Sequence, residues 1–385
     1  MLTTLFWLSL LILVYVYAGY PLLVRLLSLL KMMPVQLDDS YRPSVSIVIA
    51  AYNESADIEN TLDNKLKQDY PLEKMEILVV SDESDDGTDE IIERKARDSE
   101  CPIKLIRQVP RQGKTAGLNT LIAQACGEII LFSDANSQWD KHAVARLVSN
   151  FADPDVGYVT GKMVYVNEDG SLVGDGCSAY MKYENWLREH ETHLGSIVGV
   201  DGGIDAMRKA LHVPLRPDQL PDFVQPLKVI EQGYRVVYEP RALLKENTNE
   251  DSGSEFSMRV RVGLRALWAL KDMSHLMNPV RFGMFSFQLI SHKLLRYLAF
   301  IPLVILSMTA LLLSFDGGIY TVSFLGLVAL YVLGWIGARS IDADKKSSAF
   351  YSVPYYFLLL NFSSFKATAA FLRGEKKVIW KPRKG

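Results

Sequence analysis

The sequence has little cysteine and almost no net charge. Cys101, Cys126 and Cys177 are the only cysteines among 385 residues. Three isolated thiols argue against a disulfide scaffold and against a cysteine-ligated zinc site. Lysine plus arginine number 42 and aspartate plus glutamate number 44, which gives a formal net charge of −2. A chain so close to neutral lacks the basic surface of nucleic-acid-binding proteins, so we expect no nucleic-acid partner.

Two common nucleotide-binding motifs are also missing. No GxGxxG follows the first predicted strand, and no GxxxxGK[ST] occurs anywhere in the chain. These motifs place backbone amides and a helix N-terminus against phosphate groups. The sequence therefore does not support a Rossmann dinucleotide site or a P-loop.

Apolar runs without charge stand at both ends of the chain. Residues 1–24 carry no charge and lack the features of a cleaved signal peptide, so we predict a transmembrane helix with an interfacial extension over 1–31. Near the other end, Tyr297–Phe315 and Gly317–Ala338 flank a short turn and predict a transmembrane hairpin within 294–338. The segment between the domain and this hairpin, 251–293, contains amphipathic stretches that predict interface helices.

The distribution of basic residues predicts the orientation. Lysine and arginine follow the first predicted span and flank the hairpin, whose tip carries only Asp316. The positive-inside rule then places the central domain in the cytoplasm, at the inner membrane of a multi-pass protein. Ser347–Phe365 contains Pro354 and Asn361 and precedes a basic tail. We expect 347–385 to form a re-entrant or interfacial helix and a cytoplasmic tail, with a full crossing as the alternative.

Residues 43–250 have the length of one domain and alternate between strand-like and helix-like segments. The predicted strands are Ser44–Ala50, Met75–Val80, Lys104–Gln108 and Glu128–Ser133, and the predicted helices between them are Asp57–Lys67, Asp86–Arg97 and Thr115–Ala125. This order predicts an α/β fold with a central, mainly parallel sheet.

Acidic and amide side chains follow the predicted strands. Asp82 follows the second strand, and Asp134 and Asn136 follow the fourth. Ligands of such sheets bind beyond the carboxyl ends of the strands, and hard cations take oxygen ligands that they share with phosphates. We therefore expect a divalent cation, Mg²⁺ or Mn²⁺, with a phosphorylated ligand at this edge. Ordinary turn chemistry is the alternative explanation of such residues.

An ordered set of motifs resembles the membrane-bound, cellulose-synthase-like members of glycosyltransferase family 2, which have the GT-A (nucleotide-diphospho-sugar transferase) fold. The motifs are SIVIAAYNE at 46–54, VVSDESDDGT at 79–88, RQGKTAGLN at 111–119, FSDAN at 132–136, VGVDGGIDAMRK at 198–209, LPDFVQPLKVIEQGYRVVYEP at 220–240, RVRVGLRALWAL at 259–270 and FLRGEKKVIWKP at 371–382. The resemblance covers nearly the whole chain.

The resemblance implies a role for each matching residue. Asp222 would be the catalytic base, and Asp134 and Asn136 would occupy the metal-binding DxD motif. The remaining residues would bind the nucleotide sugar (Ala51, Tyr52, Glu54, Asp82, Lys114, Asp134), the diphosphate leaving group (Arg259, Arg261, Arg265) and the acceptor (Gly202, Gly203, Trp268). For Asp222, which begins a helix-like segment, capping of that helix is the alternative role.

The chain departs from the family pattern in three places. The DxD motif ends in Asn136, and a neutral amide is a weaker metal ligand than a carboxylate. The usual Glu-Asp pair is Pro221-Asp222, so a second carboxylate is missing there. The QxxRW motif of processive synthases is absent, and the arginine-rich segment at 259–270 occupies its place.

The sequence thus predicts an inverting glycosyltransferase of the hexosyl or N-acetylhexosaminyl class. The donor would be a nucleotide sugar, most simply a UDP-sugar, and the acceptor a lipid-linked sugar or exopolysaccharide at the cytoplasmic membrane face. The absent QxxRW motif favours the addition of one or a few sugars. A processive polysaccharide synthase, with an oligomer or partner for export, and a catalytically silent nucleotide-binding scaffold are the alternatives.

Overall fold

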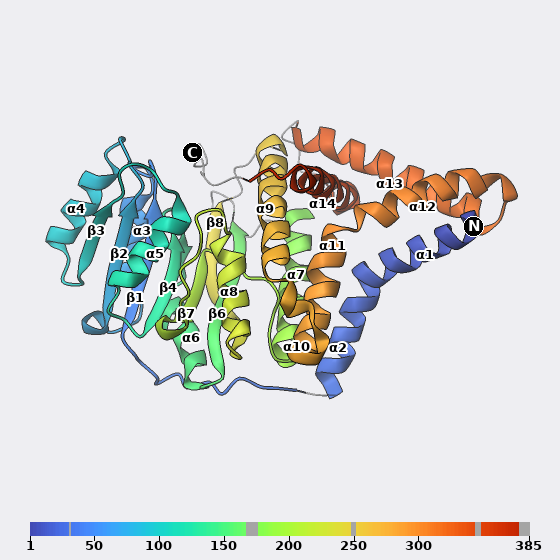
Figure 1. Cartoon of the computed structure of the whole chain (residues 1–385). Coiled ribbons are helices and arrows are strands. Elements are labelled where there is room, and N and C mark those ends of the chain that lie inside the picture. The colour runs from blue at the N-terminus through green and yellow to red at the C-terminus, as the bar shows by residue number, and fades with distance from the viewer. Residues whose placement is uncertain (31, 167–175, 248–251, 343–347, 377–385) are drawn as a thin grey trace. The chain divides into compact units, whose positions relative to one another are not determined.

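A computed structural model describes residues 1–30, 32–166, 176–247, 252–342 and 348–376 (Figure 1). The chain divides into two compact units. The α/β unit comprises Met32–Gly170 and Glu191–Asn247, and the helical unit comprises Met1–Lys31, Ser171–His190 and Thr248–Lys376. The basic tail at 377–385 lies outside the described residues.

An eight-stranded mixed sheet forms the centre of the α/β unit. Its strands are β1 (Val45–Ala51), β2 (Met75–Ser81), β3 (Ile103–Arg107), β4 (Ile129–Asp134), β5 (Gln138–Trp139), β6 (Val156–Val166), β7 (Ile204–Arg208) and β8 (Arg235–Asn247). They lie in the order β3-β2-β1-β4-β7-β6-β8-β5. The β1–β2, β2–β3, β1–β4 and β6–β8 pairs are parallel, and β7 is antiparallel to both its neighbours. The predicted mainly parallel sheet is confirmed.

Helices cover both faces of this sheet because its central strands are apolar on both sides. On one face, Ile47 and Ile49 of β1 share a buried core with side chains of α3 (Ile58–Leu66), α4 (Thr88–Asp98) and α6 (Ala143–Ser149). On the other face lies α5 (Lys114–Gln124), where a Cβ on Gly117 would come within 2.6 Å of a Val80 methyl group. That close approach fixes the start of α5 against β2.

The predicted elements of the first half of this unit agree with the observed ones to within two residues at each end. The remaining helix of the unit is α8 (Pro221–Glu231), and short 3₁₀ turns occur at Leu72–Lys74, Asn150–Ala152 and Lys209–Leu211. Helix α7 (Gly176–His193) begins in the helical unit and ends in the α/β unit. The regular alternation of short apolar strands and polar helices made these elements predictable.

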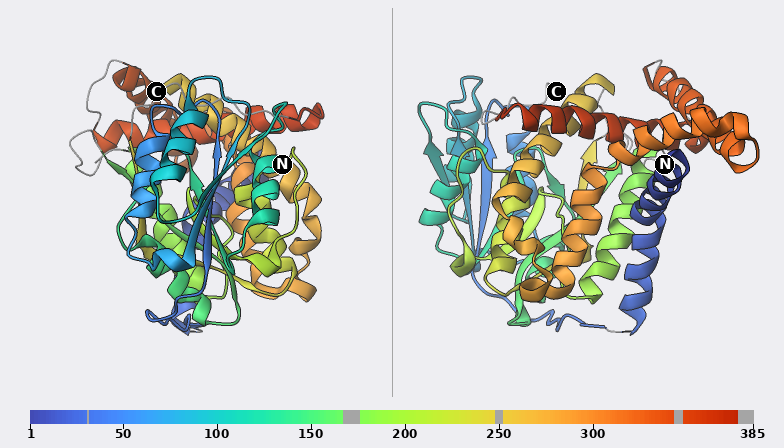
Figure 2. Two further views of the ribbon diagram at one scale, coloured as in Figure 1. Left: turned by 90° about the vertical axis from the view of Figure 1, so that its left-hand side faces the viewer. Right: turned by 45° about the vertical axis from the view of Figure 1, so that its right-hand side comes forward.

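The helical unit contains the apolar segments. Its elements are α1 (Leu2–Val14), η1 (Tyr15–Gly19), α2 (Tyr20–Leu30), α9 (Ser252–Asp272), η5 (Ser274–Met277), α10 (Pro279–Gln288), η6 (Leu289–Leu294), α11 (Leu295–Tyr297), α12 (Phe300–Leu313), η7 (Ser314–Asp316), α13 (Ile319–Asp342) and α14 (Ala349–Leu372). In Figure 2, α1, η1 and α2 follow one another as a continuous blue helix. Phe6 of α1 packs against Leu306 and Ala310 of α12.

Two helices of the described residues are long and apolar enough to cross a membrane, Leu2–Leu30 and Ile319–Ser340. Pro279–Tyr297 and Phe300–Asp316 qualify together, as a pair bent by 55°. The first helix of the predicted hairpin, Tyr297–Phe315, therefore corresponds to Phe300–Asp316, the second helix of this bent pair. In the segment predicted at 347–365, residue 347 lies outside the described residues, and residues 349–365 belong to the single helix α14, which does not reach the hydropathy of a span. Gly334 and Gly337 of α13 let α14 approach closely, as small residues do between membrane helices.

Candidate functional site

Three neighbouring strands end at the same edge of the sheet and carry polar residues there. Ala50 of β1 is paired with Asp134 of β4, and Ala51 with Ser81 of β2. Asp82 follows directly and donates its backbone N–H to the Ala51 carbonyl at 2.9 Å. The parallel register therefore brings together Asp82 and Asp134, which the sequence placed at this edge. The strand-end loops are tied by Asn53, whose side-chain amide donates to Asp85 at 2.9 Å.

Asp82 is 5% exposed and its carboxylate is held by the segment 108–113. It accepts hydrogen bonds from the Gln108 amide at 2.5 Å and the Gln112 backbone N–H at 2.9 Å, and it pairs with the Arg111 guanidinium at 3.2 Å. The same guanidinium lies 3.4 Å from the ring centroid of Tyr52. A nucleoside that bound both Tyr52 and Asp82 would therefore displace Arg111 from both.

Glu54 lies next to this cluster, just beyond β1. Burial raises the pKa of its carboxyl group to about 7, and the charges of Asp57, Asp134 and Asp86 add to the effect. Near neutral pH a large fraction of Glu54 is therefore protonated and can donate a hydrogen bond. A neutral Glu54 does not repel an anion bound at the same edge of the sheet.

Lys114 joins two carboxylates that are 88 residues apart in the sequence. Its ammonium lies 2.7 Å from Oδ1 of Asp134 and 3.9 Å from Oδ2 of Asp222. Burial alone would lower the pKa of Lys114, but Asp134 and Asp222 outweigh burial and raise it. Lys114 is therefore a permanent cation. The family resemblance assigned Lys114 to the nucleotide sugar, and the structure places it between two other predicted site residues.

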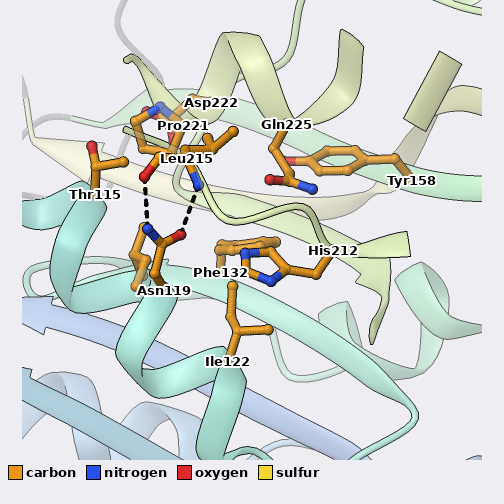
Figure 3. A pocket seen from close by; sticks show the side chains of 11 residues that line it. Thr115, Asn119, Ile122, Phe132, Tyr158, His212, Leu215, Pro221, Asp222 and Gln225 are labelled. Atoms are coloured by element: carbon orange, nitrogen blue, oxygen red, sulfur yellow. Dashed lines mark hydrogen bonds between the residues drawn. The ribbon is translucent and has the colours of Figure 1, made fainter. Parts of the chain in front are cut away.

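Helix α5 also holds the segment that leads to Asp222. Thr115 donates a hydrogen bond to the Gln219 carbonyl at 3.0 Å. The Asn119 side chain donates to the Leu215 carbonyl at 2.7 Å and accepts from the Leu215 N–H at 3.1 Å, as the dashed lines in Figure 3 show. Sequence analysis missed both residues. Their i, i+4 spacing within the RQGKTAGLN motif is the signal that places them on one helix face.

Asp222 itself lies in the first turn of α8, after Leu220 as the N-cap residue and Pro221 as the first helical residue. It is thus not the N-cap residue, the alternative that the sequence left open. Beneath it lies a cavity of about 10 Å³ lined by α5, α8 and Tyr158 (Figure 3). The cavity has room for no more than a single water molecule.

Gly202 and Gly203 lie against the two carboxylates. Gly202 has φ +88°, and a Cβ there would come within 2.8 Å of Cγ of Asp222. A Cβ on Gly203 would lie 3.5 Å from Oδ2 of Asp134. Because a Cβ at position 202 would push on the Asp222 carboxylate, glycine is required there by both conformation and space.

A buried lysine packs against the tryptophan that binds the backbone of Gly203. Lys65 of α3 is fully buried, donates to the Ser137 carbonyl at 2.8 Å and lies 4.1 Å from the centroid of the Trp139 ring. The Trp139 indole N–H in turn donates to the Gly203 carbonyl at 2.9 Å. Burial lowers the pKa of Lys65. Sequence analysis missed Lys65 because a lysine in an amphipathic helix normally faces solvent.

The predicted leaving-group residues lie in the other unit. Arg259, Arg261 and Arg265 belong to α9, where Arg259 pairs with Glu255 at 2.9 Å. Trp268 of the same helix donates its indole N–H to the Glu375 carbonyl at 2.9 Å and packs against Phe371. The roles of these residues at the diphosphate and acceptor stay predictions.

Asp134 and the exposed Asn136 offer two oxygen ligands two residues apart in the loop after β4. Within the described ranges, no group of three histidine, cysteine, aspartate or glutamate side chains could hold a metal ion. Mg²⁺ commonly binds through one or two carboxylates and completes its coordination with substrate phosphates and water. The donor set at 134–136 therefore fits a cation that arrives with a diphosphate.

A buried carboxyl group was not foreseen by sequence analysis. Asp205 of β7 is 0% exposed and accepts a hydrogen bond from the Tyr158 hydroxyl at 2.8 Å. Burial raises its pKa to about 7, and the negative charge of Asp222 contributes in the same direction. Asp205 and Asp222 therefore sense each other's charge.

This raised pKa predicts how stability depends on pH. Asp205 ionises near pH 4 in the unfolded chain and near pH 7 in the folded one, so the folded state binds more protons between these values and stability falls as pH rises through this window. We expect Asp205→Asn to flatten this slope, with an upper limit of roughly 4 kcal/mol at about 1.4 kcal/mol per pKa unit. The measurement is the thermal midpoint of both proteins from pH 4 to 8. An equal slope in the variant would contradict the assignment.

Comparison with known proteins identifies the domain. Residues 46–200 match the family model Glycosyl transferase family 2. The chain is 28% identical over 253 residues to a poly-beta-1,6-N-acetyl-D-glucosamine synthase of Staphylococcus aureus (strain COL), which covers 63% of this chain and 59% of that relative. The synthase of the same name from Staphylococcus epidermidis is 25% identical over 327 residues, or 80% and 78% of the two chains.

The fold is that of a solved structure. The mannosyltransferase PcManGT from Pyrobaculum calidifontis, in complex with GDP-Man and Mn²⁺, superposes with a TM-score of 0.74 at 23% identity, over 97% of this chain and 100% of that one. This likeness confirms the predicted GT-A fold. Residues 46–200 of this chain are therefore a glycosyl transferase family 2 domain, within a unit that has the GT-A-like α/β fold.

Proposed function

We propose that the protein is an inverting glycosyltransferase that moves a sugar from a nucleotide-diphosphate sugar to a membrane-associated acceptor. One observation carries the proposal. Lys114 lies 2.7 Å from Asp134 and 3.9 Å from Asp222, at the carboxyl edge of a family 2 domain. A cation and two carboxylates from separate elements suit a reaction in which one carboxylate accepts a proton, the other holds a metal ion, and the positive charges bind the anionic leaving group.

Asp222 is the base in this proposal. It accepts the proton of the acceptor hydroxyl while that oxygen attacks the anomeric carbon and the nucleoside diphosphate departs. Lys114, held beside both carboxylates, adds positive charge near the diphosphate. Asp82 and Tyr52 bind the nucleoside after Arg111 has moved away from them.

Asp134 and Asn136 would hold the divalent cation. The cation supplies Lewis-acid stabilisation of the diphosphate when bound. Support comes from the oxygen donor set at 134–136 and from Mn²⁺ in the complex of the similar mannosyltransferase. The arginines of α9 are the further cations that we assign to the leaving group.

The names of the relatives support a donor sugar of the N-acetylhexosamine class, and we propose UDP as its carrier. Both Staphylococcus relatives are named poly-beta-1,6-N-acetyl-D-glucosamine synthases. These names favour polymer synthesis as a second candidate function. It stays a candidate because the chain aligns with only 59% of the S. aureus relative. The absence of the QxxRW motif favours short products. The length of the product distinguishes the addition of one or a few sugars from polymer synthesis.

The apolar helices support a location at the membrane. Leu2–Leu30 and Ile319–Ser340 could each cross it. Basic residues lie at the C-terminal end of both, Arg25 and Lys31 at the first and Arg339, Lys345 and Lys346 at the second. We propose that the α/β unit is cytoplasmic, at the inner membrane. The acceptor would then be a lipid-linked sugar or a growing polysaccharide.

Substitution of the base tests the reaction. We expect Asp222→Asn to lower sugar transfer by about 10²-fold or more, because a positioned base contributes about 10²–10⁴-fold, and to leave donor affinity nearly unchanged. UDP release with a panel of UDP-sugars and membrane lipid extract measures the first quantity, and calorimetry the second. Glu231→Gln at the other end of α8 is the control. Near wild-type transfer by Asp222→Asn would remove it as the base.

Two glycines with the same backbone conformation separate strain from displacement of the base. Gly202 has φ +88° and abuts Asp222, whereas Gly233 has φ +89° and a Cβ added there would meet no atom within 4 Å. We expect Gly202→Ala and Gly233→Ala to lose similar stability, about 1–2 kcal/mol. Only Gly202→Ala should also lower the turnover number. Equal turnover in the two variants would show that Asp222 tolerates the extra methyl group.

Metal dependence tests the role of the 134–136 loop. We expect EDTA to weaken donor binding to the wild-type protein and to have little effect on Asp134→Ala, which has already lost its carboxylate ligand. Asn136→Asp restores a second carboxylate and should lower the Mn²⁺ concentration required for half-maximal activity. Unchanged wild-type affinity in EDTA would exclude a metal at this loop.

A further inference from the structure

Lys65 of α3 is a basic residue in the buried core of the α/β unit. Its side chain is 0% exposed, although lysine is almost never fully buried unless it is paired. Burying an ammonium group costs free energy, and an apolar residue of the same length would pack at this position without that cost. The contacts of the ammonium group therefore indicate what the lysine does there.

The Lys65 ammonium group has three close neighbours. It donates hydrogen bonds to the Ser137 carbonyl at 2.8 Å and to Oδ1 of Asn64 at 3.0 Å. The third neighbour is the ring of Trp139, whose centroid lies 4.1 Å from Nζ. Because an ammonium group has three N–H donors, two hydrogen bonds and one cation–π contact use its full donor capacity.

Asn64, the residue before Lys65, binds the same segment of chain. Its side-chain oxygen accepts a hydrogen bond from the Trp139 backbone N–H at 2.9 Å, and its side-chain amide donates to the Trp139 carbonyl at 2.9 Å. Trp139 belongs to β5, which pairs with β8. Residues 137–139 are thus held both by β8 and by two side chains of α3.

The segment 137–139 follows the loop that we assign to the cation. The Asp134 carbonyl accepts a hydrogen bond from the Ser137 N–H at 3.3 Å, so residues 134–137 form a turn that contains both proposed ligands. Ser137 is buried, whereas Asn136 before it is exposed. Because Lys65 holds the carbonyl of the residue next to Asn136, movement of that carbonyl would move Asn136 relative to Asp134.

We propose that Lys65 is a positioning residue for the divalent cation: through the Ser137 carbonyl it holds the turn at 134–137 in the conformation that presents Asp134 and Asn136 to the metal ion. Groups that bind behind the ligands of a metal site orient those ligands and thereby set the affinity for the metal. The inference rests on the proposed function, in which the 134–136 loop holds the cation.

The test measures the affinity of the full chain in detergent for UDP by calorimetry, in Mn²⁺ and again in EDTA. The difference between the two affinities is the contribution of the metal ion. Lys65→Met keeps the length of the side chain and removes the ammonium group. We expect it to weaken UDP binding in Mn²⁺ by about tenfold or more. The affinity in EDTA should stay close to that of the wild-type protein, because the nucleoside site is unchanged.

Three further variants separate positioning from loss of charge or stability. Lys67→Met removes an exposed positive charge two residues further along the chain, and Leu62→Ala removes buried carbons from the same helix. Both should keep the wild-type response to Mn²⁺. Asn64→Ala removes the hydrogen bonds to Trp139 from a half-buried position. It should weaken UDP binding in Mn²⁺ and serves as the test where Lys65→Met does not fold.

Three outcomes would overturn the inference, and they differ from one another. Wild-type affinity in Mn²⁺ for both Lys65→Met and Asn64→Ala would leave the metal site in place and refute only the role of Lys65. An equal loss of affinity in Mn²⁺ and in EDTA would show that Lys65 supports the whole domain and not the metal loop. Equal affinity of the wild-type protein in both conditions would refute the proposed cation site together with the inference.

Discussion

The ion contacts of Lys114 with Asp134 and Asp222 connect the two halves of the α/β unit. Asp134 ends a parallel strand in the first half of the domain, and Asp222 lies in the first turn of a helix in the second half. Two carboxylates at one edge of a sheet repel each other. The ammonium, held at 2.7 Å and 3.9 Å from them, offsets that repulsion.

Helix α5 gives this lysine its position and uses its neighbours for the same purpose. Gly117 allows the helix to approach Val80 of β2 closely, Lys114 faces the carboxylates, and Asn119 binds Leu215 in the segment before α8. A single helix turn therefore fixes both the cation and the chain that carries the proposed base. The close packing of α5 against β2 therefore also holds the polar edge of the sheet in place. A precisely placed catalytic group requires such support.

A second cation–carboxylate cluster lies in the helical unit. There the buried Glu184 accepts hydrogen bonds from His292 at 3.2 Å and from Arg296, which also donates to the Tyr183 hydroxyl. In the α/β unit, one lysine lies between two carboxylates. In both units a charge contact joins segments that are far apart in the sequence.

The sequence by itself determined the elements of the α/β unit and the polar residues at their ends. Short apolar, β-branched segments at 45–51, 75–81 and 129–134 are typical of buried strands, and parallel pairing of such strands gathers the residues at their carboxyl ends, including Asp82 and Asp134. Tertiary structure alone decided which partners these residues have. Asp82 forms an ion pair with Arg111, Lys65 is buried against the ring of Trp139, and Asp205 is a buried carboxyl group with a raised pKa. These facts depend on burial and on contacts between distant segments, which neither periodicity nor local spacing contains.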